Sequence, residues 1–180
     1  MTGCFVGVVG PSGAGKDTLI ALVREALAGD PRFVFPRRIV TRAASAWEDH
    51  DTIAPADFDR AVGDGGFSLA WRAHGLGYGL PAALAGDVAC GAVVVANISR
   101  TVVAQAGTAF PRCRIVLVTA PPEVLAARVA GRGRERGADL RQRLDRRVAS
   151  DADADLVIEN VGRPGDAAGR LAAFLRGLTG

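Results

Sequence analysis

The sequence predicts an α/β fold of three layers, in which helices cover both faces of a parallel sheet. Short apolar runs recur along the 180 residues, at 5–9, 92–96, 115–119 and 156–158. Runs of this length, apolar throughout, are typical of strands that are buried on both faces. Segments with apolar residues at helical spacing separate them. Because 49% of the residues are hydrophobic, the chain can form one domain with a substantial core.

The expected elements follow one another with little intervening loop. In the first half we expect a strand at 5–9, a helix at 16–27, a strand at 33–41 with a bend or edge at Pro36, a polar loop at 42–54, a helix at 55–62, a strand at 67–71 and a glycine-rich turn at 74–79. In the second half we expect helices at 81–90, 99–106, 121–130, 138–149 and 164–175, and strands at 92–96, 114–119 and 155–159. Ser99 is expected to cap the second of these helices, and a glycine–arginine loop is expected at 131–137.

Composition argues against a membrane protein. No apolar run approaches the roughly 20 residues that cross a bilayer. The first expected strand begins almost at the N-terminus, which leaves no room for a signal peptide, so we expect a cytoplasmic protein. Cys4, Cys90 and Cys113 form no C-x-x-C pair, and buried reduced thiols are the expectation for them.

The net charge of +3 is modest, but arginine occupies eight of the 20 positions from 128 to 147. A nucleic-acid surface or a group of arginines that closes over phosphates could each explain this clustering. The stretch lacks interleaved aromatic residues and the charge of the whole chain is modest, so we expect no nucleic-acid partner.

The segment Gly10-Pro11-Ser12-Gly13-Ala14-Gly15-Lys16 lies between the first strand and the first helix. Glycines in this G-x-x-x-x-G-K pattern let backbone N–H groups turn toward phosphate oxygens. Lys16 supplies a mobile positive charge, and the following helix directs its N-terminus at the same anion. The pattern therefore predicts a P-loop that binds a nucleoside triphosphate.

The position after Lys16 normally carries Ser or Thr, whose hydroxyl binds Mg²⁺; here it is Asp17, followed by Thr18. Asp17 either holds Mg²⁺, directly or through water, or is a helix N-terminal acid without a metal role. The strand at 92–96 ends in the uncharged Asn97, where P-loop enzymes commonly place an aspartate. We hypothesise that the metal-binding carboxylate has moved from that strand end to Asp17.

Further motifs join the P-loop: Thr41-Arg42, Glu48-x-His50, Trp71-x-x-His74 followed by Tyr78-Gly79, Asn97-x-Ser99-Arg100, and Arg128, Arg132-Gly133-Arg134-Glu135 and Arg143-Leu144. Together they span nearly the whole chain. The set resembles the guanylate kinase superfamily and, within it, the ribose 1,5-bisphosphate phosphokinases of phosphonate degradation.

The resemblance implies transfer of the ATP γ-phosphoryl group to ribose 1,5-bisphosphate, giving 5-phosphoribosyl 1-diphosphate and ADP, with Mg²⁺ as cofactor. A nucleoside monophosphate kinase acting on GMP is the alternative. Guanylate kinases usually carry a second arginine where this chain has Ser45, and a substrate-binding tyrosine that residues 49–53 lack. A non-catalytic nucleotide-binding module is the third possibility, and retention of Lys16 and Arg128 argues against it.

The resemblance also assigns roles and regions. A homodimer is possible. We expect a core at 1–33, 81–127 and 150–180, an acceptor-binding region at 34–80 and a lid at 128–149. We expect catalytic roles for Lys16, Arg128, Arg132 and Arg143, nucleotide contacts from Gly10, Pro11, Ser12, Gly13, Ala14, Gly15, Lys16, Asp17, Thr18 and Asn160, and acceptor contacts from Arg42, Glu48, His50, His74, Tyr78, Asn97 and Arg100.

Overall fold

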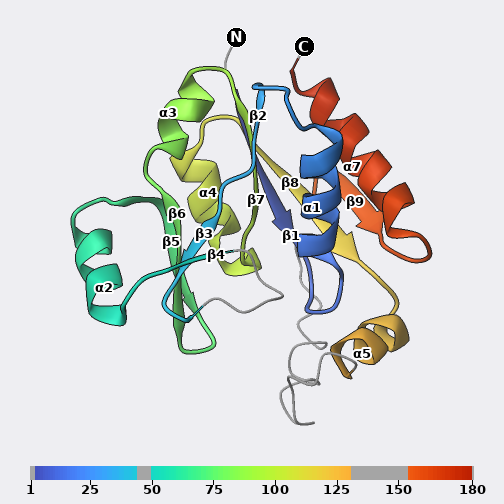
Figure 1. Ribbon diagram of the computed structural model, residues 1–180, viewed down its shortest axis with the longest axis horizontal. Helices are drawn as coiled ribbons and strands as arrows, with labels where there is room; N and C mark the ends of the chain where they lie inside the picture. Colours follow the sequence, from blue (N-terminus) through green and yellow to red (C-terminus); the bar gives the residue numbers. More distant parts are fainter. Residues whose placement is uncertain (1–2, 44–49, 131–153, 180) are drawn as a thin grey trace.

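The computed structural model describes residues 3–43, 50–130 and 154–179. Its larger sheet has five parallel strands in the order β2-β7-β1-β8-β9. The three-layer α/β prediction is therefore confirmed (Figure 1). These strands are β1 (Cys4–Val9), β2 (Phe33–Val34), β7 (Val93–Asn97), β8 (Cys113–Thr119) and β9 (Leu156–Glu159).

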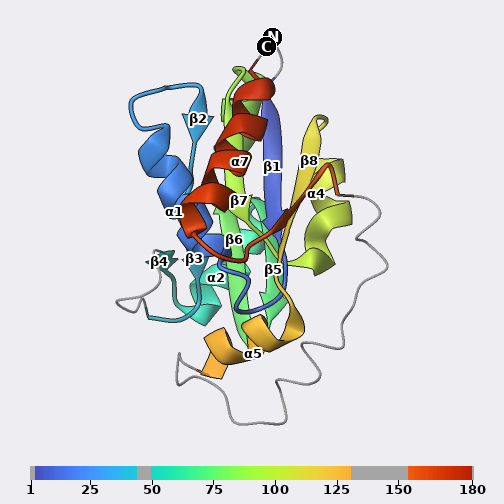
Figure 2. The same ribbon diagram turned by 90° about the vertical axis from the view of Figure 1, so that its right-hand side faces the viewer.

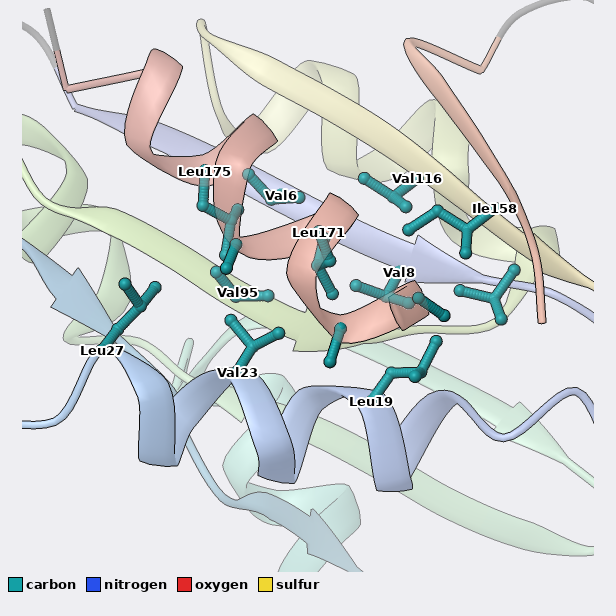
Figure 3. Close-up of a cluster of buried hydrophobic side chains, with 14 of the residues drawn as sticks. Val6, Val8, Leu19, Val23, Leu27, Val95, Val116, Ile158, Leu171 and Leu175 are labelled. Carbon is teal, nitrogen blue, oxygen red and sulfur yellow. The ribbon is translucent and has the colours of Figure 1, made fainter. Parts of the chain in front are cut away.

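Helices α1 (Lys16–Ala26) and α7 (Pro164–Gly177) pack on one face of this sheet (Figure 2). Their apolar residues recur at helical spacing and so form one stripe on each helix. Figure 3 shows side chains from both helices meeting those of the strands. The buried cluster includes Leu19 and Val23 of α1, Leu171 and Leu175 of α7, and Val6, Val8, Val95, Val116 and Ile158 of the sheet.

The opposite face is covered by α3 (Leu84–Ala89), by α4 (Val103–Ala109) and by part of a second sheet. A short 3₁₀ turn, η1 (Arg100–Val102), leads into α4, and the Ser99 side chain accepts a hydrogen bond from the Thr101 N–H, which confirms the expected cap. Phe5 of β1 stacks on Phe110 with ring centroids 4.2 Å apart. The core thus has an apolar layer on each side of the sheet.

The second sheet has four strands in the order β4-β3-β6-β5 and is accompanied by α2 (Pro55–Gly63). Its strands are β3 (Arg38–Val40), β4 (His50–Thr52), β5 (Phe67–Ala73) and β6 (Leu76–Pro81). The single strand expected at 33–41 is instead two strands, because the chain leaves the large sheet at Phe35-Pro36 and joins the small one at Arg38. Part of the expected polar loop, His50–Thr52, pairs in parallel with β3.

The expected glycine-rich turn at 74–79 is also wrong, since only His74 and Gly75 turn and β6 begins at Leu76. The glycines that flank Tyr78 make room for aromatic rings. A Cβ atom on Gly77 would lie 2.7 Å from the Phe58 ring, and one on Gly79 would lie 2.5 Å from the Phe67 ring. These glycines therefore permit close packing on one face of the small sheet, whereas Tyr78 faces the other way.

Helix α5 (Pro122–Ala130) follows β8 and lies near the loop between β1 and α1 (Figures 1 and 2). The helix expected at 138–149 lies outside the described residues. No helix in the described part of the chain is long and apolar enough to span a membrane.

The cysteine expectation was correct for Cys4 and wrong for Cys90. Cys4 is buried, Cys113 is half-buried and Cys90 is exposed at the C-terminal end of α3. Burial raises the pKa of the Cys113 thiol to about 11.

Candidate functional site

The loop that joins β1 to α1 has the backbone geometry expected of a phosphate cradle. Gly13 has φ 82° and Gly15 has φ 87°, values that residues with a Cβ rarely adopt. A Cβ on Gly13 would lie 2.9 Å from the Leu125 carbonyl oxygen of α5, and one on Gly15 would lie 2.5 Å from the Asn160 amide nitrogen. Glycine is therefore required both by the backbone conformation and by the neighbours that support the loop.

Side chains from behind the loop hold its carbonyl groups. Asn160, which follows β9 and is only 3% exposed, donates its amide N–H to the Ala14 carbonyl at 2.8 Å. Arg128 of α5 donates to the Gly13 carbonyl at 3.4 Å and to the Asn160 carbonyl at 3.0 Å. With these carbonyls bound on the core side, the loop conformation is set before an anion arrives.

Lys16 lies at the start of α1 and donates its ammonium to the Gly10 carbonyl at 2.8 Å and to the Pro11 carbonyl at 3.0 Å. The ammonium is therefore folded back over the loop whose phosphate it is expected to bind. A lysine carries a point charge on four rotatable carbons, so exchange of these carbonyls for phosphate oxygens needs only rotamer changes.

Asp17 and Asn97, the two residues linked in the hypothesis about the metal site, are in contact. The Asn97 side-chain amide, at the C-terminal end of β7, donates to Asp17 Oδ1 at 2.7 Å, although 80 residues separate the two in the chain. Arg38 of β3 also reaches this oxygen, with its Nη2 at 3.5 Å. The carboxylate therefore lies where the P-loop, the large sheet and the small sheet meet.

The residues present fit a magnesium ion that is shared with a nucleotide. Mg²⁺ commonly binds through one or two carboxylates plus substrate phosphates, and keeps several waters. Asp17 is such a carboxylate, and the following Thr18 offers a hydroxyl at the same helix end; both are exposed. In the described part of the chain no group of three or more His, Cys, Asp or Glu residues could hold a metal by itself. The described residues therefore form no metal site made of protein ligands alone.

The residues expected to bind an acceptor are spread over the small sheet and the end of β7. Tyr78 of β6 is half-buried, and its ring stacks on Trp71 with centroids 5.5 Å apart. His50, the first residue of β4, is 2% exposed, and its Nδ1 lies 3.2 Å from the Asp51 carbonyl oxygen. Neither ring is a solvent-facing loop side chain. The small sheet orients both residues. The sequence did not indicate this sheet or the burial of the two rings.

The remaining expected residues differ in exposure. Arg42 follows β3 and is exposed, and its carbonyl accepts a hydrogen bond from the Thr52 hydroxyl. His74 is exposed in the turn between β5 and β6 and has φ 52°. Arg100 begins η1, just after β7, and is half-buried. Three expected site residues, Glu48, Arg132 and Arg143, lie outside the described residues.

The structure adds Arg24 and Arg38 to these residues. Both line a small cavity together with Asp17 and Asn97. The sequence offered one signal for Arg38, an arginine that starts a short apolar strand next to Thr41-Arg42. That signal could not be interpreted without knowing that the strand crosses from one sheet to the other.

Relatives of this chain share most of its length. It is 57% identical over 176 residues to the ribose 1,5-bisphosphate phosphokinase PhnN of Methylobacterium radiotolerans, covering 98% of this chain and 99% of the relative. It is 51% identical to the protein of the same name from Brucella melitensis, covering 91% and 86%, and 52% identical to that of Rhodopseudomonas palustris, covering 90% and 82%. No family profile matches.

Among solved structures, guanylate kinase from Anaplasma phagocytophilum matches with a TM-score of 0.76 at 20% identity, covering 98% of this chain and 86% of that one. At this identity the likeness shows the fold alone. The sequence relatives show the family to which the chain belongs, because their identity to it is high and extends along nearly the whole chain. From the P-loop to the last helix, this chain belongs to the ribose 1,5-bisphosphate phosphokinase family.

Proposed function

We propose that this protein transfers the γ-phosphoryl group of ATP to the 1-phosphate of ribose 1,5-bisphosphate. The products are ADP and 5-phosphoribosyl 1-diphosphate. The observation that carries this proposal is the 57% identity, over 98% of the chain, to a ribose 1,5-bisphosphate phosphokinase. The P-loop supports it independently, because its glycine conformations and lysine suit a triphosphate.

The reaction needs no strong general base. An ionised oxygen of the acceptor 1-phosphate forms a bond to the γ-phosphorus, while the bond from that phosphorus to the bridging oxygen breaks and its electrons leave with ADP. No proton must be removed from the nucleophile. Such transfers depend mainly on positioning and on neutralising the charge of the transferring group.

The chain's own residues supply these two requirements. Lys16 lies within reach of the cradle, where its ammonium would bind the outer phosphates of the nucleotide. Asn160 and Arg128 hold the loop backbone from behind. Mg²⁺, bound at Asp17, would supply further neutralisation of the β- and γ-phosphate oxygens. Arg132 and Arg143 are proposed as additional cations, from the resemblance alone.

The acceptor is proposed to bind between the small sheet and the carboxyl end of β7. Tyr78, His50 and Asn97 come from those elements, and Arg42 and Arg100 follow the ends of β3 and β7 by two and three residues. This arrangement follows the rule that ligands of open parallel sheets bind at the carboxyl ends of the strands.

A coupled assay of ADP release tests the proposal, with ribose 1,5-bisphosphate and GMP offered separately. We expect turnover with the sugar bisphosphate and formation of a diphosphate that phosphorus NMR detects. Turnover with GMP alone would instead make the protein a nucleoside monophosphate kinase. No turnover with either acceptor would favour a nucleotide-binding module.

A further inference from the structure

A cavity of about 80 Å³ lies between α1, the connection from β2 to β3, and the end of β7. Figure 1 shows these elements beside one another at the boundary of the two sheets. The lining from α1 consists of residues 17, 20, 21 and 24, which lie on one helical stripe. The cavity has an apolar part (Ile20, Ala21, Phe35, Pro36, Val95 and Ala96) and a polar part (Asp17, Arg24, Arg38 and Asn97).

The polar part favours an anion. It holds two guanidinium groups and one carboxylate. The carboxylate, on Asp17, is also the group proposed to contact the cation of the nucleotide. A cation bound there would neutralise the carboxylate that Arg38 contacts in the ligand-free protein, and the lining would then favour a second anion. A phosphate group matches both the charge and the donor geometry of guanidinium.

Arg38 is the better placed of the two arginines. Its side chain is 20% exposed, and its register partner in β4 is His50. Val40, two residues after Arg38 in β3, is paired with Tyr78 of β6. Because side chains alternate along a strand and paired residues share a face, Arg38 lies on the same face of the small sheet as His50 and Tyr78.

Its neighbour Arg37 provides a contrast. Arg37 lies 3.4 Å from Asp51 and donates to the His50 carbonyl at 3.1 Å, and its side chain is 51% exposed. It does not line the cavity. Two adjacent arginines therefore point in different directions, and only Arg38 faces the cavity.

The contact that Arg38 makes in the ligand-free protein is weak enough to be exchanged. Its Nη2 is 3.5 Å from Asp17 Oδ1, and the Asp17 side chain is 60% exposed. Exposed ion pairs contribute about 0–1 kcal/mol, whereas a guanidinium can bind a phosphate with two parallel hydrogen bonds. When a cation is bound at Asp17, a phosphate group is therefore a better partner for Arg38 than the Asp17 carboxylate is.

We propose that Arg38 binds a phosphate group of the acceptor, and that Asp17 holds the guanidinium in place until nucleotide and cation bind. The inference rests on the proposed function, since it names a residue that recognises its substrate. It makes Arg38 a determinant of specificity for acceptors rich in phosphate. It also couples the two sites, because a cation held by Asp17 would weaken the contact between Asp17 and Arg38.

Steady-state kinetics of Arg38→Ala and Arg38→Lys test this, with Arg37→Ala as the matched control. We expect Arg38→Ala to raise the KM for ribose 1,5-bisphosphate about 10- to 100-fold, the effect of losing a charged hydrogen bond. The KM for ATP should change less than about twofold. Arg38→Lys should recover part of the loss, because lysine keeps the charge but not the planar fork. Arg37→Ala should leave both constants within about twofold.

An acceptor KM that Arg38→Ala leaves unchanged would overturn the inference. So would a parallel rise in the KM for ATP, which would indicate a general disturbance of the P-loop. If Arg38→Ala does not fold, Arg38→Lys decides, since a mere structural charge would be fully rescued by lysine.

Calorimetry separates this inference from the proposed function. If the wild-type protein does not turn over ribose 1,5-bisphosphate, the proposed function fails. Titration with inorganic phosphate, in the presence of Mg²⁺ and a non-hydrolysable ATP analogue, then decides about Arg38. Binding that is lost in Arg38→Ala and kept in Arg37→Ala supports an anion site at Arg38, and absence of binding to the wild-type protein refutes it.

Discussion

The P-loop and the small sheet hold their polar groups in different ways. The loop is supported from the core side by a buried amide, on Asn160, and by Arg128 of α5. The small sheet presents Arg38 to a carboxylate that is 60% exposed. The proposed nucleotide half, which is the P-loop with its supports, is therefore preorganised by hydrogen bonds from the core side. The proposed acceptor half, which is the small sheet, presents an ion pair that a ligand can replace. Substitutions in the two halves should consequently differ in the constant they change.

Removal of the P-loop ammonium should have the largest effect. Lys16→Met keeps most of the length of the side chain and removes the charge that is proposed to contact the outer phosphates. Loss of one donor that stabilises transition-state charge costs about 10²- to 10³-fold in kcat. We expect a fall of that size in ADP release at saturating substrates. A kcat within tenfold of the wild type would mean that other cations neutralise the transferring group.

Removal of the carboxylate at the boundary of the two halves should have the next largest effect. Asp17→Asn keeps the shape but weakens cation binding, and we expect the Mg²⁺ concentration for half-maximal activity to rise about 10-fold or more. Asp17→Ser restores the hydroxyl that P-loops usually carry here and should recover part of the loss. The measurement is a magnesium titration at fixed ATP. Unchanged metal dependence in both variants would exclude a metal role for Asp17.

The nucleotide half could largely be predicted from the sequence. The G-x-x-x-x-G-K pattern, a preceding apolar run and a following helix are local signals, and β1 and α1 have the bounds expected of them within one residue. Asn160 was expected to contact the nucleotide, a role that stays a prediction. Its hydrogen bond to Ala14 could not be foreseen, because it joins residues 146 positions apart.

The acceptor half was less predictable because its strands are short and its pairing is non-local. β3 and β4 have three residues each, too few for period-two alternation to be recognised. The glycines around Tyr78 indicated a turn, although their role is to admit the Phe58 and Phe67 rings. Arg38 therefore could not be distinguished from Arg37 until the register of β3 was known.

Asn160→Asp should disturb the nucleotide half alone. Aspartate has nearly the same shape but cannot donate to the Ala14 carbonyl, and it places a negative charge next to the loop. A buried acceptor that loses its donor costs about 1–3 kcal/mol, which corresponds to roughly 5- to 150-fold in nucleotide affinity if the loop conformation is lost. Fluorescence titration with an ATP analogue measures this, and the acceptor KM should stay within about twofold. A parallel change in both constants would contradict the separation of the two halves.

Tyr78→Phe should have the smallest effect, confined to the acceptor. The substitution keeps the ring that stacks on Trp71, so the small sheet should retain its stability. Only the hydroxyl is removed, and one such hydrogen bond contributes about 0.5–1.5 kcal/mol. We therefore expect the KM for ribose 1,5-bisphosphate to rise about 2- to 10-fold, with the KM for ATP and the melting temperature unchanged. Tyr78→Ala is the informative contrast, since it removes the stacked ring as well and should lower the melting temperature. If Tyr78→Phe leaves the acceptor KM unchanged, the residue serves the packing of the sheet only, and acceptor recognition falls to the charged groups that include Arg38.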